Sequence, residues 1–332
     1  MKLQIGEPMI YSYPVHLNHL SIISINSDYE PWFYSNYIQL SCPPEFPNDR
    51  TKIVNFFNYD DLNPFYGYSP FTKEHKTSRL EKPEQIIPHY KGLLKDQKYI
   101  NIFVDDFYLA FRPAYKLCHT PHELFLFGYD NTAEHFHVLG YDTSGKPKEY
   151  TVFFSELVAA YMSASNLLEN YTASTWMHFD YQFEYNKNQY GINLSNIISL
   201  LESYINSTEF ELMPGTVCGV SIYKLIKEYY YNYYYSLTSV DVRPFHLLWE
   251  HKNLMYIRMK YLQNYFSLDL SNYISSLFDL QQNYMILRNK LIKCEISKNR
   301  IQTDLFYKTI DSLVYNETQL YSKLIKELKK LL

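Results

Sequence analysis

The stretch ELFLFGYDNTAEHFHVLGYD (residues 123–142) contains two short apolar runs, and each run ends in Gly-Tyr-Asp. The four residues NTAE (131–134) between the runs have the length of a hairpin turn. Short runs rich in aromatic and β-branched residues and bounded by turn residues are typical of strands. The stretch therefore predicts an antiparallel β-hairpin in the first half of the chain.

The segments on either side of the hairpin predict a mixed α and β region. Upstream, YINIFVDDFYLAF (99–111) has the composition of a strand, and we expect its acidic pair, Asp105 and Asp106, to be a solvated strand end. Downstream come a second turn, a further strand and a helix capped by Ser155. Near the N-terminus, HLNHLSIISI (16–25) is apolar at helical spacing and predicts a helix.

The second half of the chain predicts helices. Leu277, Leu280, Tyr284, Leu287, Leu291 and Cys294 step by three and four residues, which is the pattern of a heptad seam. A further amphipathic helix follows a short polar link, so we expect a long antiparallel helical hairpin packed on the body; a partner-binding coiled coil is the alternative. Two regions have weaker patterns: residues 43–97 suggest loops with short elements, and residues 176–190 suggest a connector or an inserted hairpin. The predicted fold class is α+β, with domains at 1–165 and 166–332.

The composition excludes several classes of protein. A formal net charge of −4 gives no reason to expect nucleic-acid binding. No run approaches 18 apolar residues and no signal peptide is visible, so we expect a cytoplasmic protein that does not cross a membrane. The four cysteines form no metal-binding or redox pair, and no phosphate-binding loop is present, so we expect neither a metal nor a cofactor. The 36 tyrosines reflect either compositional bias or an aromatic binding surface.

The pattern PHELFLFGYD (121–130) followed by FHVLGYD (136–142) resembles the papain-like cysteine peptidase superfamily. The resemblance is greatest to the branch of bacteriocin-leader peptidases and the N-terminal domain of butirosin biosynthesis protein H, and it covers roughly residues 8–165. It implies a papain-like domain in which a thiol at the start of the first helix attacks an acyl carbonyl. It also implies a His at the start of one strand as the base, and an Asp at the end of the next strand to orient that His.

Carried onto this sequence, the resemblance makes His122 the base and Asp142 the orienting acid. The first helix opens within IYSYPVHLNHLSII (10–23), which contains no Cys. Pro14 suits the first position of a helix but cannot be a nucleophile, which leaves Ser12 as the replacement. His16, Asn18 and His19 lie on the same helix and are candidate ligand-binding residues.

Each of these residues also has a plain structural interpretation. His122 is then an inert residue at a strand start, and Asp142 a turn residue in YDTSG (141–145). Cys118 lies close to His122 in sequence, but neighbours on one loop rarely approach a substrate from both sides. Two further histidines, at positions 135 and 137, share a strand face and would need a third metal ligand, such as His119 or Glu134.

Three functions remain open from the sequence. The first is a catalytically degenerate papain-like accessory protein of a bacterial natural-product or peptide pathway, which binds a peptide or a carrier protein. The second is an active acyltransferase or amide-forming enzyme that acts on a carrier-bound thioester. The third is an interaction protein unrelated to peptidases, and self-association through the C-terminal helices is a further expectation. Because no thiol occupies the first helix, we expect no thiol-dependent turnover and slow labelling of all four cysteines without preference.

Overall fold

The computed structural model describes residues 1–49, 51–57, 69–169, 175–209, 214–236 and 240–332. The chain forms two compact units, each built from two stretches of sequence. Unit 1 comprises Met1–Tyr29 and Phe65–Gln189, and unit 2 comprises Glu30–Pro64 and Tyr190–Leu332. Unit 1 combines helices with an antiparallel sheet, and unit 2 is mainly helical, so the predicted mixture of helix and antiparallel sheet with a helical C-terminal region is confirmed.

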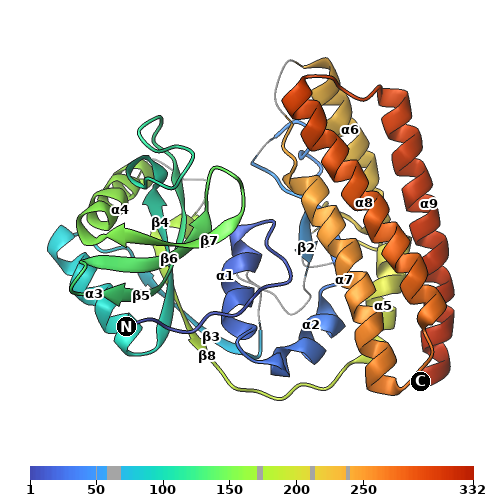
Figure 1. The fold of residues 1–332 in the computed structure, drawn as a ribbon, viewed down its shortest axis with the longest axis horizontal. Coiled ribbons are helices and arrows are strands. Elements are labelled where there is room, and N and C mark those ends of the chain that lie inside the picture. The colour runs from blue at the N-terminus through green and yellow to red at the C-terminus, as the bar shows by residue number, and fades with distance from the viewer. Residues whose placement is uncertain (50, 58–68, 170–174, 210–213, 237–239) are drawn as a thin grey trace. The chain divides into compact units, whose positions relative to one another are not determined.

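The centre of unit 1 is a six-stranded antiparallel sheet with the strand order β3-β8-β4-β5-β6-β7 (Figure 1). Its strands are β3 (Thr72–Ser78), β4 (Lys98–Asp105), β5 (Pro121–Asp130), β6 (His135–Tyr141), β7 (Pro147–Phe153) and β8 (Phe179–Tyr185). The hairpin predicted from residues 123–142 is confirmed as β5 and β6, which pair around residues 131–134. The buried apolar runs of β4 and β5 place the core of unit 1 at the centre of the sheet.

Helices cover both faces of this sheet (Figure 1). Helix α1 (Pro14–Ile23) lies on one face, where the Asn18 side chain donates to the Asn101 side chain of β4 at 2.9 Å. Helices α3 (Pro83–Lys95) and α4 (Phe154–Leu168) lie on the other face. There the hydroxyl groups of Tyr90 and Tyr161 both donate to Asp180 of β8, at 2.6 and 2.8 Å. Two layers of helix therefore enclose the sheet, as the size of its apolar core requires.

Unit 2 is a helical bundle with a small three-stranded sheet, β2-β1-β9. Its helices are α2 (Glu30–Asn36), α5 (Leu194–Asn206), α6 (Ile222–Tyr235), α7 (Arg243–Phe266), α8 (Ser271–Ser297) and α9 (Thr303–Leu328). Its strands are β1 (Gln39–Cys42), β2 (Asn55–Phe57) and β9 (Val217–Cys218). Short 3-10 segments complete the chain at Ser27–Tyr29, Asp106–Tyr108, Thr175–His178, Gly219–Ser221 and Lys329–Leu331.

The long helical hairpin predicted at the C-terminus is confirmed as α8 and α9, which pack against each other (Figure 1). All six residues of the predicted seam are buried: Leu277, Leu280, Tyr284, Leu287, Leu291 and Cys294. A seam that is already covered within unit 2 is not open to a coiled-coil partner. The heptad pattern therefore reports internal packing.

Four sequence expectations about helices, strands and boundaries differ from the structure. Residues 83–95, expected to lie among loops, form the 13-residue helix α3, whose Pro88 sits inside the helix. Residues 179–185, expected to be a connector or inserted hairpin, form β8, a strand between β3 and β4. The helix expected to be capped by Ser155 has Phe153 as its N-cap instead, two residues earlier, and the Glu156 carboxylate accepts the Phe153 N–H. The domain boundary expected near residue 165 falls inside α4.

Within the described part of the chain, each helix is too short or too polar to span a membrane.

Candidate functional site

The β5–β6 hairpin carries the two residues that the family resemblance assigns to a catalytic pair. Phe125 lies opposite Leu139, and Leu126 lies opposite Val138. The residue pairs run from Phe125 and Leu139 to Asp130 and His135, and His122 and Asp142 lie beyond the paired residues. The antiparallel topology directs the start of β5 toward the end of β6, and a direct His122–Asp142 pair stays a prediction.

The carboxylate of Asp142 is engaged in its own turn. It accepts the backbone N–H and the hydroxyl of Ser144, the ammonium of Lys148 at 2.7 Å and the hydroxyl of Tyr150 at 3.0 Å. The hydrogen bonds from Lys148 and Ser144 hold the pKa of Asp142 well below its usual range. These contacts are those of a turn residue, and the orienting role toward His122 stays a prediction.

The direction of side chains along β5 separates His122 from helix α1. Glu123, the next residue, accepts a hydrogen bond from Asn101 at 3.2 Å, and Asn101 in turn accepts one from Asn18 of α1. Glu123 therefore faces α1. Because neighbouring side chains of a strand point to opposite faces, His122 shares the face of Leu124, on which α3 and α4 lie. Alternation thus favours Glu123 over His122 as the β5 residue directed at the first helix.

The N-terminal end of α1 is where the resemblance places a nucleophile. The helix starts at Pro14, as predicted, and Tyr13 is its N-cap without a side-chain capping bond. Ser12 is 7% exposed. A hydroxyl nucleophile needs both access for the substrate and an activating base. Ser12 is buried and His122 belongs to the other sheet face, so the geometry gives little support to a serine variant of papain chemistry.

The three candidate ligand-binding residues of α1 are all buried: His16, Asn18 and His19. Asn18 is engaged with Asn101. Both ring nitrogens of His19 lack a hydrogen-bond partner among the described residues. Burial, and then the nearby His16, lowers the pKa of His19 to about 4, so its ring is neutral at pH 7. Their role as ligands stays a prediction.

An open, largely apolar pocket lies beside α1, with a cavity volume of about 160 Å³. It is lined by the N-terminal segment, α1 and the hairpin end, through Ile5, Gly6, Glu7, Pro8, Tyr11, Leu17, Ser21, Leu139 and Pro147. Two long-range hydrogen bonds fix its walls. The Gly6 N–H donates to the Ser21 carbonyl at 2.8 Å, and the Tyr141 hydroxyl donates to the Tyr11 carbonyl at 2.6 Å.

Glycine is needed at position 6 of this pocket wall. A Cβ atom there would lie 2.4 Å from the carbonyl oxygen of Ser24, at the end of α1. The N-terminal segment therefore presses directly on the helix backbone. The pocket is a feature of the fold that the sequence reasoning did not find, because its walls come from four separate stretches of the chain.

A second cluster of polar residues forms where β4 ends and β5 begins. The Asp105 carboxylate is fully buried, and it accepts His119 Nδ1 at 2.6 Å and the Ser163 hydroxyl at 2.7 Å. It also accepts the backbone N–H groups of Phe107 and Thr120. Burial alone would raise the pKa of Asp105, but these hydrogen bonds outweigh it and hold the pKa below its usual value.

This cluster corrects the expectation of a solvated strand end. Asp105 is 0% exposed, and Asp106 is 5% exposed and pairs with Arg112 at 3.1 Å. In this loop the carboxylate of Asp105 binds the imidazole of His119, three residues before His122. A signal was present in the sequence, because an antiparallel pair brings the end of one strand beside the start of the next.

The histidines of β6 do not form a metal site in the described residues. His135 and His137 lie on one strand with their ring centroids 4.9 Å apart. No group of three His, Cys, Asp or Glu side chains able to hold a metal ion occurs within the described ranges. His119, considered as a third ligand, is instead bound to Asp105.

The four thiols differ in accessibility. Cys42, Cys218 and Cys294 are buried, and Cys118 is exposed. Burial, followed by the nearby Cys218, raises the pKa of the Cys42 thiol far above its usual value. Labelling without preference, as expected from the sequence, therefore does not fit this structure.

We expect Ellman's reagent to modify one thiol per folded molecule, at Cys118, because a thiol must reach solvent to react. The other three should react only in denaturant. Mass spectrometry of the labelled peptides checks the site, and a Cys118→Ser variant should release almost no thiolate colour while folded. Fast labelling of a buried cysteine would contradict this assignment.

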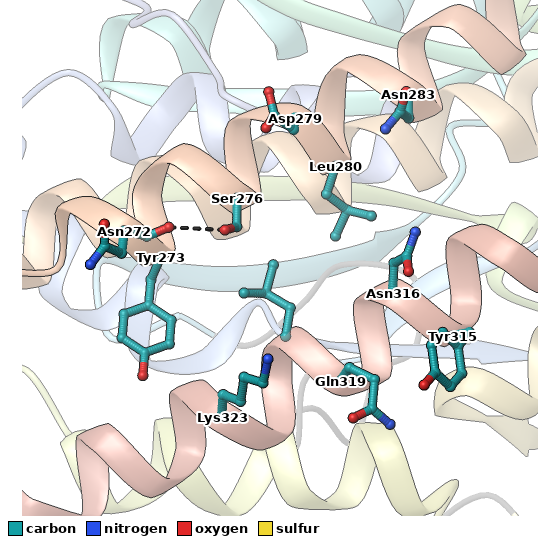
Figure 2. A pocket seen from close by; sticks show the side chains of 11 residues that line it. Asn272, Tyr273, Ser276, Asp279, Leu280, Asn283, Tyr315, Asn316, Gln319 and Lys323 are labelled. Carbon is teal, nitrogen blue, oxygen red and sulfur yellow. Dashed lines mark hydrogen bonds between the residues drawn. The ribbon is translucent and has the colours of Figure 1, made fainter.

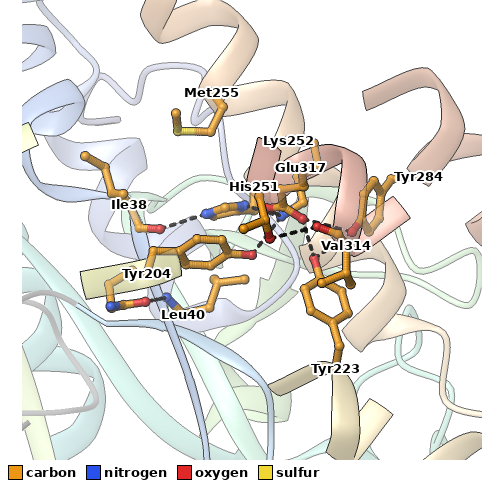
Figure 3. A network of polar contacts seen from close by, with 12 residues as sticks. Ile38, Leu40, Tyr204, Tyr223, His251, Lys252, Met255, Tyr284, Val314 and Glu317 are labelled. Carbon is orange, nitrogen blue, oxygen red and sulfur yellow. Dashed lines mark hydrogen bonds and ion pairs between the residues drawn. The ribbon is translucent and has the colours of Figure 1, made fainter. Parts of the chain in front are cut away.

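The interior of unit 2 contains a network of buried polar side chains (Figure 3). Lys252 and Glu317 form an ion pair, and both side chains are fully buried. The Lys252 ammonium also donates to the Tyr204 hydroxyl at 3.0 Å and to His251 Nδ1 at 2.8 Å. His251 Nε2 donates to the Ile38 carbonyl at 2.7 Å, which assigns the ring proton to Nε2.

The remaining carboxylate oxygen of this network faces two tyrosines. Glu317 Oε2 lies 3.1 Å from the Tyr223 hydroxyl and 3.0 Å from the Tyr284 hydroxyl, which are 2.8 Å from each other. The Lys252 ammonium lies within 5.7 Å of the ring centroids of Tyr204, Tyr223 and Tyr284. Burial lowers the pKa of Lys252 to about 8, against the opposing effect of Glu317. The side chains of this network are all buried, and its contacts are those of a structural centre.

A groove between α8 and α9 is open and polar, with a cavity volume of about 700 Å³ (Figure 2). Amide, hydroxyl and charged side chains line it: Asn272, Tyr273, Ser276, Asp279, Asn283, Tyr315, Asn316, Gln319 and Lys323. Leu280 and Leu320 complete the lining. Such a surface does not resemble the apolar seam of a coiled coil, and self-association through these helices stays a prediction.

Comparison with known proteins does not assign this geometry to a family. No protein-family model matches the chain, and no curated protein matches it significantly.

Proposed function

We propose that unit 1 is a catalytically degenerate papain-like domain that binds a peptide or a carrier-linked ligand. The order of its elements supports this proposal, because a first helix is followed by an antiparallel hairpin that carries His122 near its start and Asp142 directly after its end. The lack of a thiol at the start of α1 supports the absence of papain-type turnover. Without a thiol nucleophile, the role that we propose for the region around α1 is ligand binding.

The observation that carries the binding role is the pocket beside α1. Its volume of about 160 Å³ is close to the ~150 Å³ of an apolar cavity that accommodates benzene. One aliphatic side chain or one short acyl chain therefore fits. Leu17 and Leu139 supply apolar walls, and Glu7 supplies one carboxylate. A ligand with a small apolar group and a neutral or cationic polar end matches this lining.

We expect butyryl-pantetheine, a mimic of an acylated carrier arm, to bind unit 1 more tightly than pantetheine without the acyl group. Filling the pocket by Leu139→Trp should weaken butyryl-pantetheine binding at least about tenfold, because the indole occupies the acyl site. Isothermal titration calorimetry measures both affinities. Circular dichroism checks that the variant is folded.

Leu117→Trp is the matched control, since Leu117 is 80% exposed and is not among the residues that line the pocket. It should leave the affinity for butyryl-pantetheine unchanged. Equal binding of pantetheine and butyryl-pantetheine, or unchanged binding in the folded Leu139→Trp variant, would count against an acyl pocket. An acylated protein recovered after incubation with the thioester would instead favour the acyl-transfer alternative.

A further inference from the structure

One oxygen of the Asp105 carboxylate accepts backbone N–H groups, and the other accepts side-chain donors. Oδ1 accepts the N–H of Phe107 at 3.1 Å and the N–H of Thr120 at 2.9 Å. Oδ2 accepts the Ser163 hydroxyl at 2.7 Å and His119 Nδ1 at 2.6 Å. Four donors thus fix a fully buried carboxylate, which in turn fixes the imidazole. An ionised carboxylate only accepts hydrogen bonds, so Nδ1 of the neutral His119 ring carries the proton.

The other edge of the His119 ring is open. The side chain is 50% exposed although Nδ1 is bound to a buried group. The Phe107 ring stacks on the imidazole, with centroids 4.3 Å apart at an interplanar angle of 26°. The ring is therefore held by a hydrogen bond at one edge and by a stacked ring on one face. The Nε2 edge is left with its lone pair.

We propose that His119 is a general base for the hydrolysis of activated acyl esters and thioesters, with Asp105 as the residue that orients it. Water attacks the acyl carbonyl carbon while Nε2 takes a proton from that water. The bond from the carbonyl carbon to the leaving oxygen or sulfur then breaks, and the leaving group takes the proton from Nε2. The products are a carboxylic acid and an alcohol or thiol. Asp105 stays ionised throughout and stabilises the imidazolium.

The surroundings favour acyl over phosphoryl substrates. Phosphoryl transfer needs cationic groups that clamp the phosphate oxygens. Arg112, the arginine nearest to this loop in the sequence, is buried and committed to the Asp106 carboxylate and the Glu123 carbonyl. The ammonium of Lys116, in the loop itself, lies over the Tyr115 ring at 5.0 Å from its centroid. The aromatic residues Phe107 and Tyr108 stand beside His119 instead. They suit the apolar body of an acyl or aryl ester.

A second histidine pair in unit 1 serves as an internal reference. His75 Nε2 lies 4.0 Å from a carboxylate oxygen of Glu184, and the His75 side chain is 53% exposed. Its exposure matches that of His119, but its carboxylate is neither close nor buried. Any reactivity that comes from exposure alone should therefore be equal at the two histidines.

Asp105→Asn is the sharpest test of the orienting role. Asn keeps an oxygen at the position that accepts the two backbone N–H groups, so the turn can persist. Its amide nitrogen then faces His119 and donates to Nδ1, which moves the ring proton to Nε2 and removes the base. We expect hydrolysis of p-nitrophenyl acetate at pH 7.5, corrected for buffer, to fall about tenfold or more. His119→Gln should cause the same loss.

The rate at which the His119 ring is acylated depends on its orientation by Asp105, and it would not change if Asp105 had a purely structural role. Diethyl pyrocarbonate should acylate His119 about ten times faster than His75 in the native protein, and at a similar rate in Asp105→Asn. The ¹⁵N shifts should change from a protonated Nδ1 to a protonated Nε2. His75→Gln should leave ester hydrolysis unchanged. Unaltered hydrolysis in folded His119→Gln, or a protonated Nε2 in the native protein, would overturn the proposal.

Discussion

Replacing Lys252 by methionine should lower the free energy of unfolding of the helical unit by about 3–5 kcal/mol. The substitution leaves Glu317 buried without its cation, although Tyr223 and Tyr284 still contact the carboxylate. Removing one partner of a buried pair costs more than the pair itself contributes, because the remaining charge is neither solvated nor neutralised. Guanidinium unfolding followed by circular dichroism at 222 nm measures the change.

The double variant separates the cost of an orphaned charge from the value of the pair. Lys252→Met combined with Glu317→Leu removes both charges, so it should recover most of the stability lost in either single variant. Lys227→Met is the matched surface control. Lys227 pairs with Asp311 at 2.8 Å between α6 and α9, where both side chains reach solvent, and its loss should cost at most about 1 kcal/mol. Single variants as stable as the native protein would refute the argument.

The same network explains how the helices of unit 2 find one arrangement. Its members come from α5, α6, α7, α8 and α9, and His251 extends it to the carbonyl of Ile38. Apolar packing alone tolerates helices that slide by a turn, since leucines repeat along each of them. A lysine whose three protons go to Glu317, Tyr204 and His251 can be satisfied in one register only. We infer that this network specifies the packing of the bundle.

Elements with a strong local pattern were predictable from the sequence. The β5–β6 hairpin follows from two apolar runs around a short turn, and the α8 seam follows from its spacing of three and four residues. Strand β8 was not predictable. Its partners, β3 and β4, lie about a hundred residues away in sequence, and its residues FDYQFEY carry polar side chains that look exposed. Asp180 is nevertheless buried, because Tyr90 and Tyr161 bind it.

The candidate site was also predictable only in part from the sequence. The family resemblance points to His122 and Asp142, which lie near the start of β5 and directly after β6. The sequence could not show that Asp105 would turn inward and hold His119, because that depends on Ser163 of α4 and on two backbone N–H groups. At Asp105, the last residue of β4, tertiary contacts rather than the strand's own alternation set the side-chain direction.

Lowering the pH should decrease the free energy of unfolding through His19, because the pKa of this residue is lower in the folded chain than in the unfolded one. The folded pKa is about 4, below the ordinary value of 6.5. Between these two values the unfolded chain binds a proton that the folded chain does not, so stability falls as the pH is lowered from about 6.5 to 4. At about 1.4 kcal/mol for each unit of pKa, His19 alone accounts for a loss of about 3 kcal/mol.

His19→Leu should flatten this acid limb, because a leucine places an apolar side chain where the imidazole has no hydrogen-bond partner among the described residues. The buried Asp106 carboxyl, whose pKa burial raises to about 6, acts in the opposite direction over part of the same range. It is present in both proteins, so the difference between their unfolding free energies at pH 7 and pH 4.5 isolates His19. His75→Leu is the control for removing an imidazole elsewhere in unit 1, since the His75 side chain is 53% exposed. Parallel stability curves for the native protein and His19→Leu would mean that the His19 ring takes up its proton as readily in the folded chain as in the unfolded one.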